Sequence, residues 1–155
     1  MLLLVIFLCA ISTPCGAWPA RVVTVTDGDT IGVEPVSGGE QVKIRLYGID
    51  TPERKQPFGE AARGLVFDIA LYRSVSIEEK SRDRYGRIVA TVWLDTGESL
   101  QSMLLEAGLA WVWPRYCRNC QSWEELQKKA HMLGLGIWGE PAPIPPWEWR
   151  RRVRP

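Results

Sequence analysis

Charged residues gather in four short segments at the ends of predicted strands. The segments are DGDT (27–30), RLYGIDTPE (45–53), RDRYGR (82–87) and WVWPRY (111–116). Side chains converge at strand ends, and the loops that follow are exposed and often carry function. Acids dominate the first segment, acids and arginines share the next two, and aromatic rings dominate the fourth. These are residue types that bind cations, phosphate groups and nucleobases.

The acids of the first two segments suit a hard cation. Oxygen donors are offered by Asp27, Asp29, Asp50, Thr51 and Glu53. Together they are able to form an all-oxygen site for an ion such as Ca²⁺. The single histidine, His131, excludes a histidine-rich transition-metal site and is expected to be an ordinary helix residue. Taken alone, DGD is more typical of a tight turn with a capping aspartate than of a metal site.

Two arginines suggest phosphate recognition. Arg45 lies within a strand-like segment, where a buried charge must pair with an acid or face a cleft. Arg87 opens the strand that follows RDRYG. Guanidinium groups bind phosphate oxygens bidentately, and a neighbouring carboxylate is able to orient a water molecule. The same residue types also describe a salt-bridge network, and residue types alone leave both interpretations open.

The spacing of Arg45 and Asp50 adds a geometric condition. Residues five apart on one regular strand point to opposite faces. A bend must therefore separate these two residues if both line one site. Gly48 is the natural position for that bend.

The order of the predicted elements indicates an α+β fold. Alternating patterns predict two strands within 21–36 and one within 40–49, and the pattern returns at 74–81 and 86–94. Helical periodicity predicts helices at 57–72, 99–107 and 123–138. Three strands, a helix, two strands and further helices are typical of a five-stranded OB-type β-barrel with three packed α-helices.

The chain has room for one compact domain, which we place at 18–139. Its 155 residues are 46% hydrophobic and 24% charged, which excludes a disordered chain, a collagen or a coiled coil. Residues 140–155 form a Pro-rich, Arg-ended tail. The last six residues hold four of the 19 Lys and Arg, so residues 18–149 carry 15 basic and 18 acidic groups, a net charge of −3. The tail is expected to be a solvated end or a contact to nucleic acid or anionic lipid.

The N-terminal segment 1–17 resembles a secretory signal peptide. It has no charged residue, an apolar run over 2–11 and small residues ending at Ala17. We therefore expect a secreted or periplasmic protein. An uncleaved segment would instead anchor the protein at the cell surface, and membrane contact is expected only then. Cys117 and Cys120 are expected to form a disulfide in an oxidising compartment, with free thiols as the alternative.

The motifs DGDT, RLYGIDTPE, DRYGR and GLAWV, in this order and at these separations, resemble the staphylococcal nuclease (thermonuclease-like) family. The similarity covers roughly residues 21–138. It implies an OB-fold barrel with three helices and calcium-dependent hydrolysis of phosphodiester bonds in DNA and RNA. It implies no protein partner, and a monomer is the default.

The resemblance also implies roles for individual residues. Those matching the calcium site are Asp29, Asp50 and the main-chain oxygen of Thr51, with Asp27 just outside the ligands. Glu53 matches the general base, and Arg45 and Arg87 match the two catalytic arginines. Arg84 and Tyr85 match positions that contact phosphate and nucleotide in the family. Trp113 or Tyr116 lies where the family has an aromatic stretch that stacks on bases.

The alternative function is a catalytically silent barrel that only binds nucleic acid. Such a protein is expected to have lost Arg45, Glu53, Arg87 or a metal carboxylate, and this chain keeps all of them. We therefore expect an endonuclease with little sequence specificity. The acidic body departs from the strongly basic members of the family and is expected to weaken nonspecific binding.

Overall fold

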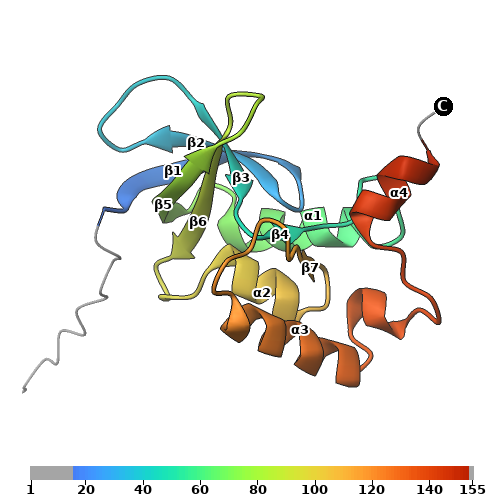
Figure 1. Ribbon diagram of the computed structural model, residues 1–155. Coiled ribbons are helices and arrows are strands. Elements are labelled where there is room, and N and C mark those ends of the chain that lie inside the picture. The colour runs from blue at the N-terminus through green and yellow to red at the C-terminus, as the bar shows by residue number, and fades with distance from the viewer. Residues whose placement is uncertain (1–15, 154–155) are drawn as a thin grey trace, which may run out of the picture.

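The computed structural model describes residues 16–153 of the chain (Figure 1). Residues 1–15, which make up nearly all of the predicted leader, lie outside the described part, so the signal-peptide interpretation stays a prediction. None of the helices within 16–153 is long and apolar enough to cross a bilayer.

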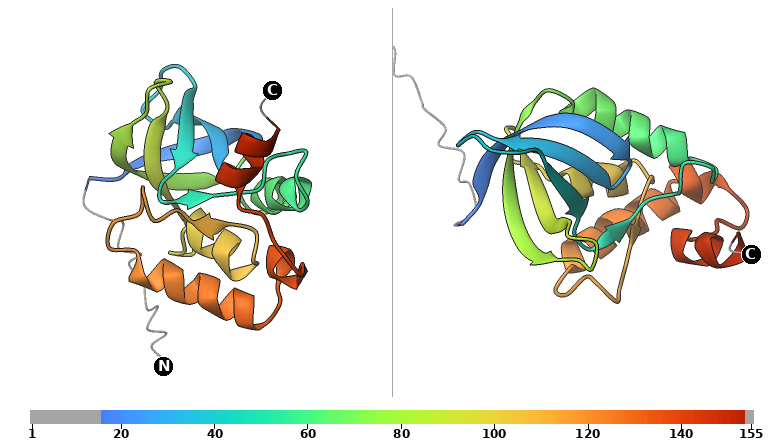
Figure 2. Two further views of the ribbon diagram at one scale, coloured as in Figure 1. Left: turned by 45° about the vertical axis from the view of Figure 1, so that its right-hand side comes forward. Right: turned by 90° about the horizontal axis from the view of Figure 1, so that it is seen from above.

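Five strands form a closed barrel in the order β1-β2-β3-β6-β5. They are β1 (Trp18–Asp27), β2 (Thr30–Pro35), β3 (Val42–Leu46), β5 (Ser74–Arg82) and β6 (Ile88–Leu94). The first three form the expected antiparallel meander, and the parallel pair β3–β6 and the antiparallel pairs β5–β6 and β1–β5 complete the ring. Figure 2 shows this ring from above. The predicted α+β class and five-stranded barrel are confirmed.

Alternating apolar residues fill the barrel and bind the helices to it. Val22, Ile31, Ile44, Ile77 and Val92 are fully buried inside. Helix α1 (Gly59–Ala70) packs on β1, and its buried side is made of small residues. Helix α2 (Leu100–Glu106) packs between β6 and helix α3 (Gln121–Met132). Burial of each large side chain contributes about 1.5–3 kcal/mol, so the core holds the strand ends in fixed positions.

The three predicted helices are present, with two differences at the C-terminal end. The helix expected over 123–138 ends at Met132, because Gly134 adopts a left-handed φ of 64°, and a 3₁₀ turn, η1 (Gly136–Gly139), follows. A fourth helix, α4 (Pro146–Arg152), begins with a proline in its first turn and was not predicted. The prediction of a solvated tail is wrong for this segment, as its contacts below show.

A sharp bend separates β3 from the two-residue strand β4 (Ile49–Asp50), which pairs with β7 (Trp111–Val112). Gly48 lies in this bend with a φ of 74°, as the spacing of Arg45 and Asp50 predicted. A Cβ atom there would lie 2.6 Å from the Cys117 sulfur and 2.9 Å from the Trp123 ring. A disulfide joins Cys117 to Cys120, with their Cα atoms 5.8 Å apart. The disulfide loop and α3 therefore pack against the bend that orients Asp50.

We expect Gly48→Ala to destabilise the protein by about 2–4 kcal/mol, because left-handed strain adds to overpacking. Gly97→Ala is the matched control, since Gly97 has a φ of 86° but open space around its Cα. It should cost only the strain, about 1 kcal/mol. Urea unfolding measures both values. Equal losses in the two variants would contradict the packing of Cys117 and Trp123 on the bend.

Candidate active site

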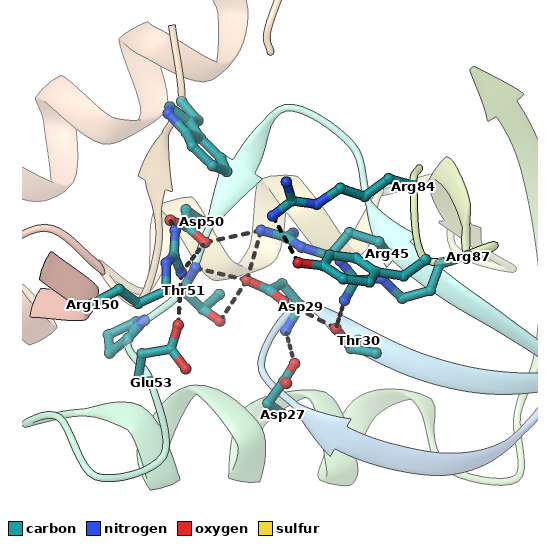
Figure 3. A pocket seen from close by; sticks show the side chains of 13 residues that line it. Asp27, Asp29, Thr30, Arg45, Asp50, Thr51, Glu53, Arg84, Arg87 and Arg150 are labelled. Atoms are coloured by element: carbon teal, nitrogen blue, oxygen red, sulfur yellow. Dashed lines mark hydrogen bonds and ion pairs between the residues drawn. The ribbon is translucent and has the colours of Figure 1, made fainter. Parts of the chain in front are cut away.

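A cleft of about 320 Å³ opens where the β1–β2 turn, the β3–β4 bend, the β5–β6 loop and α4 meet (Figure 3). Its lining contains four arginines and four acids among Asp27, Asp29, Thr30, Arg45, Asp50, Thr51, Pro52, Glu53, Arg84, Tyr85, Arg87, Trp113 and Arg150. The structure thus brings together the metal, catalytic and phosphate-contact residues expected from the sequence. Tyr116 and the two cysteines lie outside this lining.

Asp29 is the most thoroughly fixed acid in the cleft. Its Oδ2 accepts hydrogen bonds from the main-chain N–H and the hydroxyl of Thr51, both at 3.0 Å, and contacts Arg45 Nη2 at 3.1 Å. Its Oδ1 accepts the hydroxyl of Thr30 at 3.2 Å. Asp27 lies behind it and accepts the Asp29 N–H at 3.1 Å. The DGDT turn is therefore tied directly to the residue that follows Asp50.

Two acids of the cleft, Asp27 and Asp50, have raised pKa values. Burial, with added repulsion from Asp29, raises the pKa of Asp27 to about 6. Asp50 is 1% exposed, and burial raises its pKa to about 6 against the opposing hydrogen bond from Arg150. The charge of Asp29 adds to the rise, and that of Arg45 opposes it. This end of the barrel concentrates negative charge that favours a bound cation.

Arg45 satisfies both conditions stated for a charge on a strand: it pairs with acids and it lines the cleft. Its Nη2 lies 2.9 Å from Asp50 Oδ1 and 3.1 Å from Asp29 Oδ2, while Nη1 donates to the Leu46 carbonyl at 2.9 Å. The bend at Gly48 makes the pairing with Asp50 possible. One guanidinium group thus links β3, β4 and the β1–β2 turn.

Arg87 is held by an acid that the sequence reasoning missed. Asp83 Oδ2 accepts Arg87 Nε at 2.7 Å, and Asp83 Oδ1 accepts the Arg87 main-chain N–H at 3.0 Å. Arg87 Nη1 donates to the Thr30 hydroxyl at 3.3 Å. Burial would raise the pKa of Asp83, but these hydrogen bonds outweigh it and lower the pKa. An aspartate four residues before an arginine in a tight loop was the available signal.

The aromatic residues divide between the rim of the cleft and its surroundings. Tyr85 is 69% exposed, accepts Arg84 Nη2 at 2.7 Å and lies beneath the Arg84 and Arg87 guanidinium groups. Trp113 lines the cleft, and Tyr116 packs edge-on against it with ring centroids 4.4 Å apart. Tyr116 therefore supports Trp113 from outside the cleft, and stacking of either ring on a base stays a prediction.

Glu53 combines an exposed carboxylate with a fixed backbone. Its side chain is 42% exposed. Its main-chain N–H donates to Gln56 Oε1 at 3.1 Å, and its carbonyl accepts the Gln56 N–H at 2.7 Å. Gln56 is buried and was not recognised from the sequence. The loop after β4 thus holds Glu53 in place while leaving its carboxylate accessible.

Arg150 of α4 is the unexpected member of the site. Its Nη2 lies 2.7 Å from Asp50 Oδ2, and its Nη1 lies 2.6 Å from Glu53 Oε1 and 3.3 Å from Asp50 Oδ1. Burial would lower the pKa of Arg150, but the hydrogen bonds to Asp50 and Glu53 outweigh it and raise the pKa. No motif marked this residue, because the arginine run at 150–152 reads as a plain basic end.

The donors fit a hard cation by chemical type, but they are not arranged as a ready-made cage. Asp29 and Asp50 both contact Arg45 Nη2, so their carboxylates share one small region of the cleft. Over residues 16–153, no three acidic, histidine or cysteine side chains converge tightly enough to hold a metal alone. Since Ca²⁺ takes six to eight oxygens, water and substrate would have to complete the shell.

Comparison with known proteins shows which family the chain belongs to. A family model described as "Staphylococcal nuclease homologue" matches residues 43–140. A protein of Escherichia coli named "Uncharacterized endonuclease" is 36% identical over 149 residues, covering 96% of this chain and 95% of the relative. A protein of Shigella flexneri named "Micrococcal nuclease" is 32% identical, covering 91% of this chain and 86% of the relative. The chain therefore belongs to the staphylococcal nuclease family.

Proposed function

We propose that the protein is a calcium-dependent endonuclease that hydrolyses phosphodiester bonds of DNA and RNA with little sequence specificity. The observation that carries this proposal is the presence of Glu53, Arg45 and Arg87 in one cleft with the carboxylates of Asp29 and Asp50. The endonuclease and nuclease names of the relatives support the reaction class. The calcium dependence and the role of each residue are our inference from the donor types and the family resemblance.

The cation would be held by Asp29, Asp50 and the main-chain oxygen of Thr51, with Asp27 behind them. When bound, Ca²⁺ supplies positive charge against the negative charge that develops on the phosphate oxygens. Asp29 is held by Thr51 and Asp50 by the bend at Gly48, so both ligands have fixed positions before any cation arrives. Such preorganisation reduces the cost of stabilising the transition state.

Arg45 and Arg87 bind the non-bridging phosphate oxygens. They enter the cleft from β3 and from the end of the β5–β6 loop, and each is oriented by an acid. Charge-assisted hydrogen bonds from both groups would strengthen as negative charge develops. Asp83 acts as a positioning residue, because it holds the Nε edge of Arg87 while Nη1 reaches Thr30 at the cleft.

Glu53 accepts the proton of the attacking water. A positioned general base of this kind contributes about 10² to 10⁴ in rate. Its exposed carboxylate reaches solvent, and Gln56 fixes its backbone. Tyr85 and Trp113 offer stacking surfaces at the cleft. Stacking is tolerant of base identity, which agrees with low sequence specificity and with action on both DNA and RNA.

One observation favours the alternative of a silent nucleic-acid-binding module. Arg150 engages both Asp50 and Glu53, the two groups assigned to the cation and to water. In a silent module this pairing would be permanent. In an enzyme it must be displaceable, and cleavage assays separate the two cases.

We also propose that the protein is exported. The leader pattern of residues 1–17 suggested this, and the disulfide between Cys117 and Cys120 supports it, because such bonds persist in oxidising compartments. Removal of the leader gives a secreted or periplasmic protein. Retention of the leader gives a surface-anchored one with the same chemistry.

We expect Glu53→Gln to lower the cleavage rate by about 10² to 10⁴, because the amide accepts no proton from water. Cleavage of single-stranded DNA, duplex DNA and RNA is followed with Ca²⁺ and with excess chelator, which should abolish it. Glu60→Gln is the control, since Glu60 pairs only with surface arginines in the described structure. Tight binding of DNA by wild type and Glu53→Gln alike, without cleavage by either, would establish the silent module.

We expect Asp83→Asn to lower kcat by about 10- to 100-fold, because Arg87 loses a charge-assisted partner worth about 1.5–3 kcal/mol. A double-mutant cycle with Arg87→Ala tests whether Asp83 acts through Arg87. In that background, Asp83→Asn should have little further effect on kcat. A full additional loss would contradict the positioning role and indicate a general effect on the fold.

We expect the full chain, expressed in a bacterial host, to appear outside the cytosol with residues 1–17 removed. Fractionation followed by intact-mass measurement distinguishes the possibilities. A full-length mass in the membrane fraction would indicate the anchored form. A full-length mass in the cytosolic fraction would contradict export.

A further inference from the structure

The C-terminal segment lies across the mouth of the active site. In the left view of Figure 2, α4 lies beside the loop that connects β4 to α1, and the ion pairs from Arg150 to Asp50 and Glu53 join the two segments. Figure 3 shows the Arg150 side chain reaching Asp50 and Glu53 from this helix. The Arg150 guanidinium group therefore contacts the oxygens that the proposed function assigns to a cation and to the attacking water.

Other specific contacts, in addition to the ion pairs, hold the C-terminal segment at the cleft. The buried amide of Gln56 donates to the Ile144 carbonyl at 2.5 Å, and the same side chain accepts the Glu53 N–H. Trp147 stacks on Trp113 with centroids 5.9 Å apart and planes 11° from parallel. Arg150 lies 5.6 Å from the centre of the Trp113 ring. The docked position is thus defined by hydrogen bonding, stacking and charge together.

Arg150 supplies the charge that the rest of the cleft lacks. Arg45 faces Asp29 and Asp50, and Arg87 is occupied by Asp83. Arg150 places one positive charge between Oδ2 of Asp50 and Oε1 of Glu53. Because Asp50 is 1% exposed, leaving it short of positive charge would be costly. A second cation at this position, in addition to Arg45, therefore stabilises the charged form of Asp50.

A guanidinium group and a metal ion cannot share these oxygens. A hard cation binds carboxylate oxygen at about 2.3–2.6 Å. The Arg150 nitrogens lie at 2.7 Å and 2.6 Å from oxygens of Asp50 and Glu53, and they carry charge of the same sign as the metal. Steric overlap and repulsion exclude simultaneous binding. The docked Arg150 also occupies Oε1 of Glu53, one of the two oxygens that are able to receive a proton from water.

Three features of the C-terminal segment allow α4 to dissociate from the cleft. Helix α4 has seven residues, which is too short for a helix to be stable in water without its packing partners. Its main anchor, Arg150, keeps 33% of its side chain exposed, so the ion pairs are partly screened. Residues 141–145, which connect α4 to the body, have no regular secondary structure. Loss of the Arg150 contacts would therefore leave the Trp147 stacking and the Ile144 hydrogen bond to hold this short helix in place.

We propose that Arg150 is a built-in counter-ion that occupies the cation position of the active site, and that Ca²⁺ and docked α4 compete for it. The identity of the competing cation rests on the proposed function. Without Ca²⁺, α4 closes the cleft and neutralises Asp50 and Glu53. With Ca²⁺, Arg150 is displaced, α4 undocks and Glu53 becomes free to act on water.

Calcium affinity, measured by calorimetry on the full chain without nucleic acid, tests the competition. We expect Arg150→Gln to bind Ca²⁺ about tenfold more tightly than wild type, or about 1.4 kcal/mol, because the competing cation is gone. Arg151→Gln is the matched control, since Arg151 is exposed on the same helix, and its affinity should equal that of wild type. Equal or weaker binding by Arg150→Gln would overturn the proposal.

Hydrogen exchange of residues 146–153 provides a second readout. In wild type, Ca²⁺ should accelerate exchange of the α4 amides, whose hydrogen bonds break when the helix undocks. In Arg150→Gln, exchange should already be fast without Ca²⁺. Ca²⁺-independent or slowed exchange in wild type would overturn the proposal.

These readouts separate the competition from the proposed function because neither requires cleavage. Tighter Ca²⁺ binding by Arg150→Gln, in a protein that cleaves nothing, would support the competition and defeat the nuclease assignment. A different result would support the nuclease assignment and defeat the competition: Ca²⁺ affinity is unchanged in Arg150→Gln, but calcium-dependent cleavage at saturating Ca²⁺ falls tenfold. It would place Arg150 on the substrate.

Discussion

The contact of the Arg45 guanidinium with Asp29 and Asp50 is the interaction on which the rest of the site depends. Two carboxylates that are almost removed from water repel each other, and each alone would be costly to bury. Arg45 Nη2 lies within 3.1 Å of both, so it links the β1–β2 turn to β3 and β4. Arg45 is itself stable on a strand only because those acids are present. The three residues therefore require one another.

The barrel supplies the rigidity that this arrangement needs. Arg45 lies on β3 and Asp50 on β4, and the two point to one cleft only because the chain turns at Gly48. That turn is pressed by Cys117 and Trp123, which belong to the last third of the chain. The disulfide loop and α3 thus act on the site without lining it. A site made of strand ends and loops is thus held in place by residues that lie outside its lining.

Local sequence patterns predicted the strands, the helices and most charged residues of the cleft. They did not predict the contacts that form only when the chain folds. Alternation and helical periodicity predicted the five strands and three helices, and charged motifs predicted that Asp29, Asp50, Glu53, Arg45 and Arg87 lie in one site. The third helix was predicted too long because its apolar period continues past Gly134, where the backbone cannot. Asp83 acts on Arg87 and Gln56 acts on Glu53, which lie four and three residues away, whereas the partners of Arg150 lie 97 and 100 residues away. Of these three residues, Arg150 is the one whose partners are too distant in sequence for a local pattern to reveal them.

The uneven charge of the chain has a structural reason once α4 is placed. The acidic body and the basic end are parts of one electrostatic unit, because Arg150 brings the charge of the end into the cleft. With Arg150 docked, four arginines balance four acids in the lining. Exchanging Arg150 for a divalent cation, as proposed, changes this formal charge from zero to plus one. A phosphodiester anion would then be attracted to the lining only after the exchange, so one displacement would both expose Glu53 and favour entry of the substrate.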